Sequence, residues 1–393
     1  MATSIIITLC VLILLAYLFD ISSAKTRIPT VILLLLLGWI IRQLTLFFAV
    51  PVPDLSSLLP LLGTVGLILI VLEGSLELEL NQSKLPLIKK AALVSFFPLI
   101  VSALLMAGLF CYFGGYPYRQ SLINVLPFAI ISSAIAIPSA RNLNPYNREF
   151  VTYESSLSDI IGVIVFNFVA LNAVIDINAV MHFGWQLILI LIISFLASVG
   201  LSYLLGKIQH HVKFIPIMVM VILIYIVSKH YHLPSLLFIL LFGVFVGNLD
   251  ELKQNKWVAK LKPDDLNKEV HKFREIATEA AFVIRTFFFL VFGYLIETNE
   301  LLNTGTLLWA GAVIAVIFGV RAIQLKIYGL PLFPLLFIAP RGLISILLFL
   351  TIASEDKIPL VNDSLIIQVI VLTALIMMGG MMGIKKNKAS DPA

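Results

Sequence analysis

The chain has 393 residues, of which 60% are hydrophobic and 12% are charged. Soluble domains carry about 45–50% apolar and about 25% charged residues. This composition therefore excludes a soluble enzyme and a nucleic-acid-binding protein, in spite of a formal net charge of +5. The two cysteines, Cys10 and Cys111, lie in apolar runs and predict no disulfide framework. The sequence predicts a polytopic membrane protein.

Apolar runs of membrane-spanning length recur along the whole chain. A transmembrane helix needs about 20 predominantly apolar residues, and the runs lack the strict alternation of a membrane barrel. We expect an all-α protein with about 13 transmembrane helices on this criterion. Their predicted ranges are 4–19, 28–48, 58–79, 91–113, 121–140, 150–175, 184–206, 214–229, 233–248, 275–296, 303–320, 330–353 and 364–383.

Lysine and arginine are distributed unevenly between the predicted connections. The connections after the odd-numbered spans contain most of them, and the intervening ones contain only Arg119, Lys229 and Lys357. We expect the protein to lie in the cell membrane (plasma or inner membrane). Because cytoplasmic loops are enriched in Lys and Arg, we expect its N-terminus outside and its C-terminus in the cytoplasm. The basic segment 250–274 is expected to be a cytoplasmic amphipathic linker near anionic headgroups or a solvated loop. Residues 384–393 are expected to be a cytoplasmic tail.

Few ionisable side chains fall inside the predicted spans. Each indicates a functional site, because placing a charge at the bilayer centre costs about 2.5–3.5 kcal/mol on insertion scales. Asp159 is the strongest candidate, since it lies roughly 13 Å inside the span 150–175 at 1.5 Å per residue. Ser155 lies one turn before it and Gly162 almost one turn after it. These residues predict an oxygen-lined pocket for a small cation, and a structural salt bridge of Asp159 is the alternative.

Other ionisable residues lie in the spans or at their ends. Glu154 is expected to belong to a structural ion pair rather than to bind a transported ion. Glu73 lies near the cytoplasmic end of the span 58–79, where it lines an entry or extends to the interface. Arg285 and Arg341 lie in the spans 275–296 and 330–353.

Prolines fall inside two of the predicted spans. The span 121–140 contains SSAIAIPSAR with Pro138, and the span 330–353 contains FIAPRG with Pro340. Proline removes a backbone donor and interrupts a helix. Interruptions at corresponding places in two halves predict inverted repeats, with the binding site where the two broken helices cross. A kink without a ligand role is the alternative for either proline alone.

At these segments the chain resembles the monovalent cation/proton antiporter superfamily, which includes the sodium/proton exchangers. The segments are GLILIVLEGSLELEL (66–80), ESSLSDIIGVIVF (154–166), IRTFFFLVFGYLIE (284–297), VRAIQ (320–324) and APRGLISILL (339–348). Each motif alone is weak, and their order and spacing over essentially the whole chain carry the resemblance. The resemblance also implies a homodimer formed through a scaffold.

The resemblance assigns roles to residues of the sixth predicted helix. It implies that Asp159 is the carrier carboxylate and Ser155 a co-ligand of the monovalent cation. Ser158 replaces the first residue of the final pair of the family motif, and it is predicted to belong to the cation- and proton-binding site with Asp159 and Ser155. Glu154 resembles the glutamate that pairs with an arginine of the eleventh helix, here Arg321.

The resemblance also covers the two interrupted helices and the tenth helix. Arg285 stands where many members carry a cation that faces the core, and Arg341 matches the arginine that follows the break in helix 12. Many members have Thr-Asp before the proline of the fifth helix, where this chain has Ala136 and Ile137 before Pro138. The resemblance therefore implies that a second acidic side chain and a hydroxyl are missing from the crossing.

These observations predict a secondary active transporter that exchanges a monovalent cation for H⁺. Na⁺ is the expected cation, and Li⁺ and K⁺ stay open. Asp159 binds either a proton or the cation, because desolvation disfavours its free charged form. A single carboxylate predicts one-for-one, electroneutral exchange without a cofactor. We expect a core (spans 4–6 in 91–175 and spans 11–13 in 303–383) to rock against a scaffold (1–80 and 214–296), with a linking helix at 184–206.

Three alternatives stay open from the sequence. A K⁺/H⁺ antiporter or K⁺ efflux member of the same superfamily is the first, although the chain lacks the usual nucleotide-sensing domain. A proton-coupled transporter of another solute needs more polar groups than the site offers. An intramembrane enzyme needs a nucleophile and base or a metal cluster, and the histidines lie outside the spans or at their ends: His182, His210, His211, His230, His232 and His271.

Overall fold

The structure is a computed structural model that describes residues 2–26, 28–50, 52–78, 83–172, 176–208, 213–231, 233–249 and 263–383. All regular secondary structure in these ranges is helical. The first part of the predicted linker, residues 250–262, and the predicted tail, residues 384–393, lie outside the described residues. The predicted all-α class is confirmed.

The N-terminal half contains two long helices around an interrupted one. The elements in chain order are α1 (Ala2–Thr26), α2 (Thr30–Phe47), α3 (Leu58–Glu77), α4 (Leu85–Gly114), α5 (Tyr118–Ala129), α6 (Ser133–Ser139), a 3₁₀ turn (Ala140–Asn142) and α7 (Pro145–Leu171). The predicted span 121–140 is therefore divided into α5 and α6, between the long helices α4 and α7.

The C-terminal half repeats this arrangement after a group of three helices. Its elements are α8 (Ile177–Lys207), α9 (Phe214–His230), α10 (Ser235–Gly247), α12 (Pro263–Leu295), α13 (Thr298–Leu301), α14 (Thr304–Ile327), α15 (Leu332–Leu335), α16 (Leu343–Thr351) and α17 (Asp363–Met382). The predicted span 330–353 is divided into α15 and α16. Because α12 begins at Pro263, residues 263–274 of the predicted linker are helical and continue into the span 275–296.

Polar side chains fix the beginnings of several helices. The side chain of Asn144 accepts a hydrogen bond from the Asn147 N–H at 2.8 Å at the start of α7. Asn362 accepts from the Leu365 N–H at 3.1 Å at the start of α17. A side-chain oxygen at this position satisfies one of the free N–H groups of the first turn.

Nine helices in the described ranges are long and apolar enough to cross a membrane, if the pair α5–α6 is taken as one. Shorter apolar helices are α9, α10 and the segment Cys10–Ser23 of α1. The protein is therefore an integral membrane protein by its helices, and the larger number of spans expected from the sequence stays a prediction.

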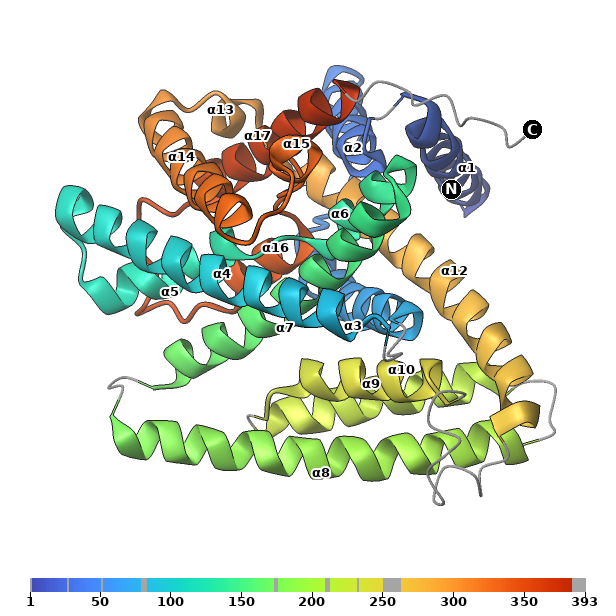
Figure 1. The fold of residues 1–393 in the computed structure, drawn as a ribbon. Helices are drawn as coiled ribbons and strands as arrows, with labels where there is room; N and C mark the ends of the chain where they lie inside the picture. The colour runs from blue at the N-terminus through green and yellow to red at the C-terminus, as the bar shows by residue number, and fades with distance from the viewer. Residues whose placement is uncertain are drawn as a thin grey trace, which may run out of the picture.

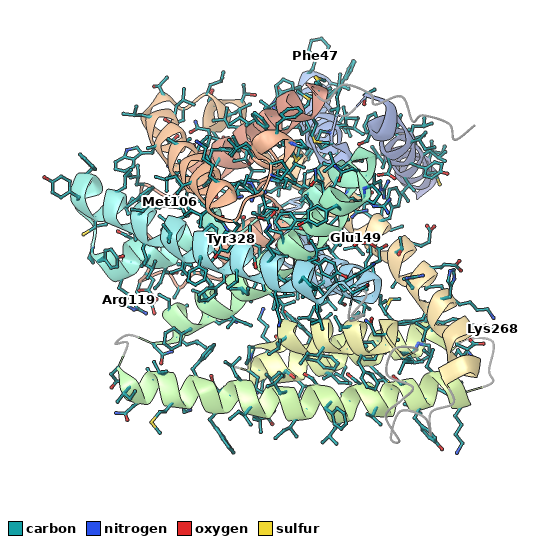
Figure 2. All side chains as sticks on the ribbon, viewed as in Figure 1. Phe47, Met106, Arg119, Glu149, Lys268 and Tyr328 are labelled. Carbon is teal, nitrogen blue, oxygen red and sulfur yellow. The ribbon has the colours of Figure 1, made fainter. Side chains whose placement is uncertain are left out.

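The contacts between helices divide the chain into two groups. In the first, α4 packs against α5, α7 and α14, and α14 packs against α17. In the second, α12 packs against α2 and α3, and α10 packs against α3 and α8. Figure 1 shows α8 running along one side of the molecule, beside α9 and α10. Arg119 and Lys268, which the charge distribution assigns to opposite sides of the membrane, lie at opposite edges of the molecule in Figure 2.

Candidate cation-binding site

The interruption between α5 and α6 lies at residues 130–132. Three successive backbone N–H groups, at positions 131 and 132 and at the first residue of α6, bind other elements. The Ile131 N–H donates to Ser158 Oγ of α7 at 3.0 Å. The Ser132 N–H donates to the Pro340 carbonyl at 2.9 Å, and the Ser133 N–H donates to Asp159 Oδ2 at 3.2 Å. Since Pro340 lies in the second interruption, the two broken helices meet directly, as the sequence predicts.

The carbonyl groups on the other side of this interruption bind one arginine. The buried Arg341 guanidinium donates to the carbonyls of Phe128 and Ala129 at the end of α5, and to the Ala339 carbonyl of its own chain segment at 2.7 Å. The carbonyls that end a helix carry partial negative charge, which a cation stabilises. Backbone groups freed by a break inside a membrane need such partners, so Arg341 holds the crossing together.

The second interruption is bonded in the same manner as the first. The Arg341 N–H donates to Thr373 Oγ1 of α17 at 3.2 Å, just as the Ile131 and Ser133 N–H groups donate to side chains of α7. In each half, therefore, the broken helix donates to the long helix that follows it. This correspondence is the structural form of the predicted inverted repeat.

Asp159 lies at the centre of the crossing and is 1% exposed. Its Oδ1 atom is buried and has no hydrogen-bond partner among the described residues, and the same holds for Ser132 Oγ. Ser155 Oγ donates to the Val151 carbonyl of its own helix at 2.7 Å, which leaves the hydroxyl oxygen able to accept or coordinate. Buried polar atoms are normally satisfied, so Asp159 Oδ1 and Ser132 Oγ are the candidate ligand atoms at the crossing.

The structure corrects the predicted position of the first break. Ala136, Ile137 and Pro138 all lie inside α6, downstream of the interruption. The break occurs where tertiary partners take the backbone N–H groups, and Pro138 falls in the last turn of a short helix. Ser132 and Ser133 lie at the crossing instead. They supply hydroxyls there although the Thr of the family motif is missing, whereas residues 130–133 contain no acid.

The space left by Gly162 is also used differently from the prediction. A Cβ atom at this position would overlap the side chain of Ile130. Gly162 therefore lets α7 contact the interruption closely, and its space is filled by Ile130 rather than left for a cation.

We expect Gly162→Ala to lower stability and transport, because overpacking of a dense interior costs about 1–3 kcal/mol. The displaced residue is the first of the three in the break, so the crossing moves with it. Thermal unfolding in detergent and cation-dependent proton flux in proteoliposomes measure the two effects. Gly108→Ala in α4 is the matched control, since a Cβ atom there meets no atom within 4 Å. Equal behaviour of the two variants would contradict the packing role of Gly162.

Glu154 and Arg321 form the buried ion pair expected from the sequence. Arg321 Nη1 and Nη2 lie 2.7 and 3.0 Å from the two oxygens of Glu154. Arg321 Nε donates to the Leu335 carbonyl at 2.8 Å. The side chains of Arg321 and Glu154 are 5% and 1% exposed. The pair joins α7 to α14 and to the end of α15, so it binds the two halves of the first helix group together.

Glu73 and Arg285 lie away from the crossing, at a large cavity. Their closest oxygen and nitrogen atoms are 3.8 Å apart. They line a first cavity of about 520 Å³ that extends to Ser133 and Ala134 beside Asp159. Its other charged lining residues are Glu77, Lys84, Arg141, Arg148, Glu149 and Arg274. The cavity therefore brings charged side chains close to Ser133, whose N–H binds Asp159.

The fold and the crossing define a class of protein. An all-helical membrane bundle with inverted repeats, two interrupted helices that cross, and a buried carboxylate at the crossing is a secondary transporter of small ions. A family profile described as sodium/hydrogen exchanger, transmembrane, matches residues 10–384. The chain therefore belongs to this family, and it is an integral membrane protein that carries out cation/proton antiport.

Solved structures share this fold. The sodium proton antiporter MjNhaP1 from Methanocaldococcus jannaschii at pH 8 is similar with a TM-score of 0.71 at 19% sequence identity, over 96% of this chain and 99% of that chain. A structure of the same antiporter from an electron microscopy map gives a TM-score of 0.70 at 19% identity, over 96% of this chain and 94% of that chain. No protein of curated function matches the sequence.

Proposed function

We propose that the protein exchanges one Na⁺ for one H⁺, and that the two compete for Asp159. Ser155 and the free hydroxyl of Ser132 are the proposed co-ligands of the cation, while Ser158 holds the backbone of the break. A single observation carries this proposal. Asp159 Oδ1 is buried at the crossing without a partner in the described structure, although an uncompensated charge is unfavourable there. A proton or a small cation relieves this cost, and either one excludes the other.

The charges around the crossing support electroneutral exchange. Glu154 is neutralised by Arg321, and Arg341 is held by carbonyl groups. Asp159 is then the one carboxylate at the crossing, within the described structure, that changes its occupant. The protonated state and the Na⁺-bound state carry the same net charge, so the transport cycle moves no net charge.

The orientation, the assembly and the moving parts are also proposals. We place the protein in the cell membrane (plasma or inner membrane), with its N-terminus outside and its C-terminus in the cytoplasm. Lys and Arg are concentrated in the connections that this orientation assigns to the cytoplasm. The first cavity then faces the cytoplasm. We propose that the group of α4–α7 and α14–α17 moves against the group of α2, α3, α10 and α12, and that the latter group forms a homodimer contact.

The cation and the competition can be tested on the wild-type protein in proteoliposomes with a pH-sensitive dye. Na⁺ is expected to dissipate an imposed pH gradient, with Li⁺ and K⁺ tested in parallel. Because one carboxylate binds either ion, each tenfold rise in proton concentration is expected to raise the Na⁺ concentration for half-maximal rate by up to about tenfold, by mass action.

Three results would overturn parts of the proposal. A response to K⁺ in place of Na⁺ would make the protein a K⁺/H⁺ antiporter. A half-maximal Na⁺ concentration that does not change with pH would contradict competition at one site. A rate that changes when valinomycin and K⁺ set the membrane potential would contradict electroneutral exchange.

A further inference from the structure

A second cavity lies near the opposite end of α3 from the first. It has a volume of about 430 Å³. Ser56 and Leu59 before and at the start of α3 line it, together with Phe292 of α12. Its other wall includes Ile346 and Phe349 of α16. Its charged lining residues are Glu300, Lys357 and Asp363.

The two cavities are related by the inverted repeat. Both are bounded by α3 and α12 on one side. The first cavity is completed by α6 and α7, which follow the first interruption. The second is completed by α16 and α17, which follow the second interruption. An inversion that exchanges α3 with α12 and α7 with α17 therefore exchanges the cavities as well, and it places them on opposite sides of the membrane.

The two cavities differ in their access to the crossing. The first extends to Ser133, whose N–H binds Asp159. In the second, Phe349 packs against Phe128 with ring centroids 4.7 Å apart. Phe128 is fully buried, and its carbonyl accepts the Arg341 guanidinium. This aromatic pair therefore lies between the second cavity and the backbone of the crossing.

We propose that the second cavity is the outer vestibule of the transport path, and that Phe349 closes it from the site by packing on Phe128. This inference rests on the proposed function. In this arrangement the carboxylate communicates with the cytoplasmic cavity while the aromatic pair excludes water from the other side. The opposite exposure requires the rings of Phe349 and Phe128 to separate.

Removing the Phe349 ring is expected to expose the site to both sides of the membrane at once. Proteoliposomes with wild-type protein or with Phe349→Ala are given a pH gradient without Na⁺, and valinomycin with equal K⁺ on both sides prevents charge build-up. We expect the wild type to hold the gradient and Phe349→Ala to lose it. Phe110→Ala is the matched control, because the buried Phe110 of α4 packs on Trp309 at a similar centroid distance of 4.8 Å. A gradient held by Phe349→Ala would overturn the closing role.

Thiol labelling tests the vestibule itself and does not depend on transport. Cys10 and Cys111 are first replaced by serine, and Ser56→Cys or Thr152→Cys is added. An impermeant maleimide outside intact cells is expected to label the cysteine at the exposed position 56, which lines the second cavity, and not the one at position 152 in the first. The reverse pattern would overturn the assignment of sides. If wild-type protein shows no exchange with any cation, the proposed function fails. The labelling result still decides on which side of the membrane the second cavity opens.

Discussion

Asp159→Asn is expected to reduce cation-dependent proton flux to the level of empty liposomes. Asparagine has nearly the same shape and still accepts the Ser133 N–H, which Asp159 binds at 3.2 Å. It cannot release a proton or neutralise a cation, so both half-reactions are lost while the crossing persists. The measurement is the dye response to Na⁺, Li⁺ and K⁺, with thermal unfolding of the same preparation to show that the variant is folded.

Ser158→Ala is the matched control for Asp159→Asn. It leaves the Ile131 N–H without its acceptor, at a cost of about 1–3 kcal/mol for an unsatisfied buried donor. We expect lower stability and retained cation-dependent exchange, since Ser158 holds the break and does not carry charge. Cation-dependent flux in Asp159→Asn equal to that of the wild type would show that another group carries the ion.

The residues that the sequence identified most directly are the charged ones. Asp159, Glu154 and Arg321 are expensive inside a bilayer, so their presence in or beside apolar segments is informative by itself. The similarity of their segments to the family motifs predicted that Glu154 and Arg321 pair. The structure brings these two side chains together and places Asp159 at the crossing.

The position of the first break was not readable from local sequence. Pro138 is the obvious helix breaker, yet the helix is interrupted at residues 130–132 and continues through the proline. The cause is tertiary, because Ser158, Pro340 and Asp159 supply acceptors for three backbone N–H groups. The adjacent serines, Ser132 and Ser133, were the available signal, since hydroxyl residues in a buried apolar run need partners.

Cavities and closing contacts require the arrangement of helices that are distant in sequence. Gly162 suggested an empty space, and the structure fills that space with Ile130 from the first interruption. Phe128 and Phe349 are separated by more than half of the chain, and each alone is an ordinary apolar residue of a membrane helix. Only the packing of α5 against α16 shows that the two rings meet.

Loss of the buried ion pair is expected to have the largest effect on stability. Arg321→Met leaves the Glu154 carboxylate, 1% exposed in its side chain, without its positive partner. Removing one member of a buried pair costs about 3–5 kcal/mol, whereas replacing both members is far less harmful. Arg321→Met combined with Glu154→Gln is therefore expected to recover much of the loss. The measurement is the unfolding midpoint of purified protein in detergent.

Glu149→Gln is the matched control for the buried pair, because Glu149 pairs with Lys84 at 3.2 Å with its side chain 35% exposed. Pairs exposed to this degree contribute about 0–1 kcal/mol, so its midpoint is expected to stay close to the wild-type value. A double variant as unstable as Arg321→Met would contradict the charge argument. The hydrogen bond from Arg321 to the Leu335 carbonyl would then be the main contribution of Arg321, which would stabilise the second interrupted helix rather than Glu154.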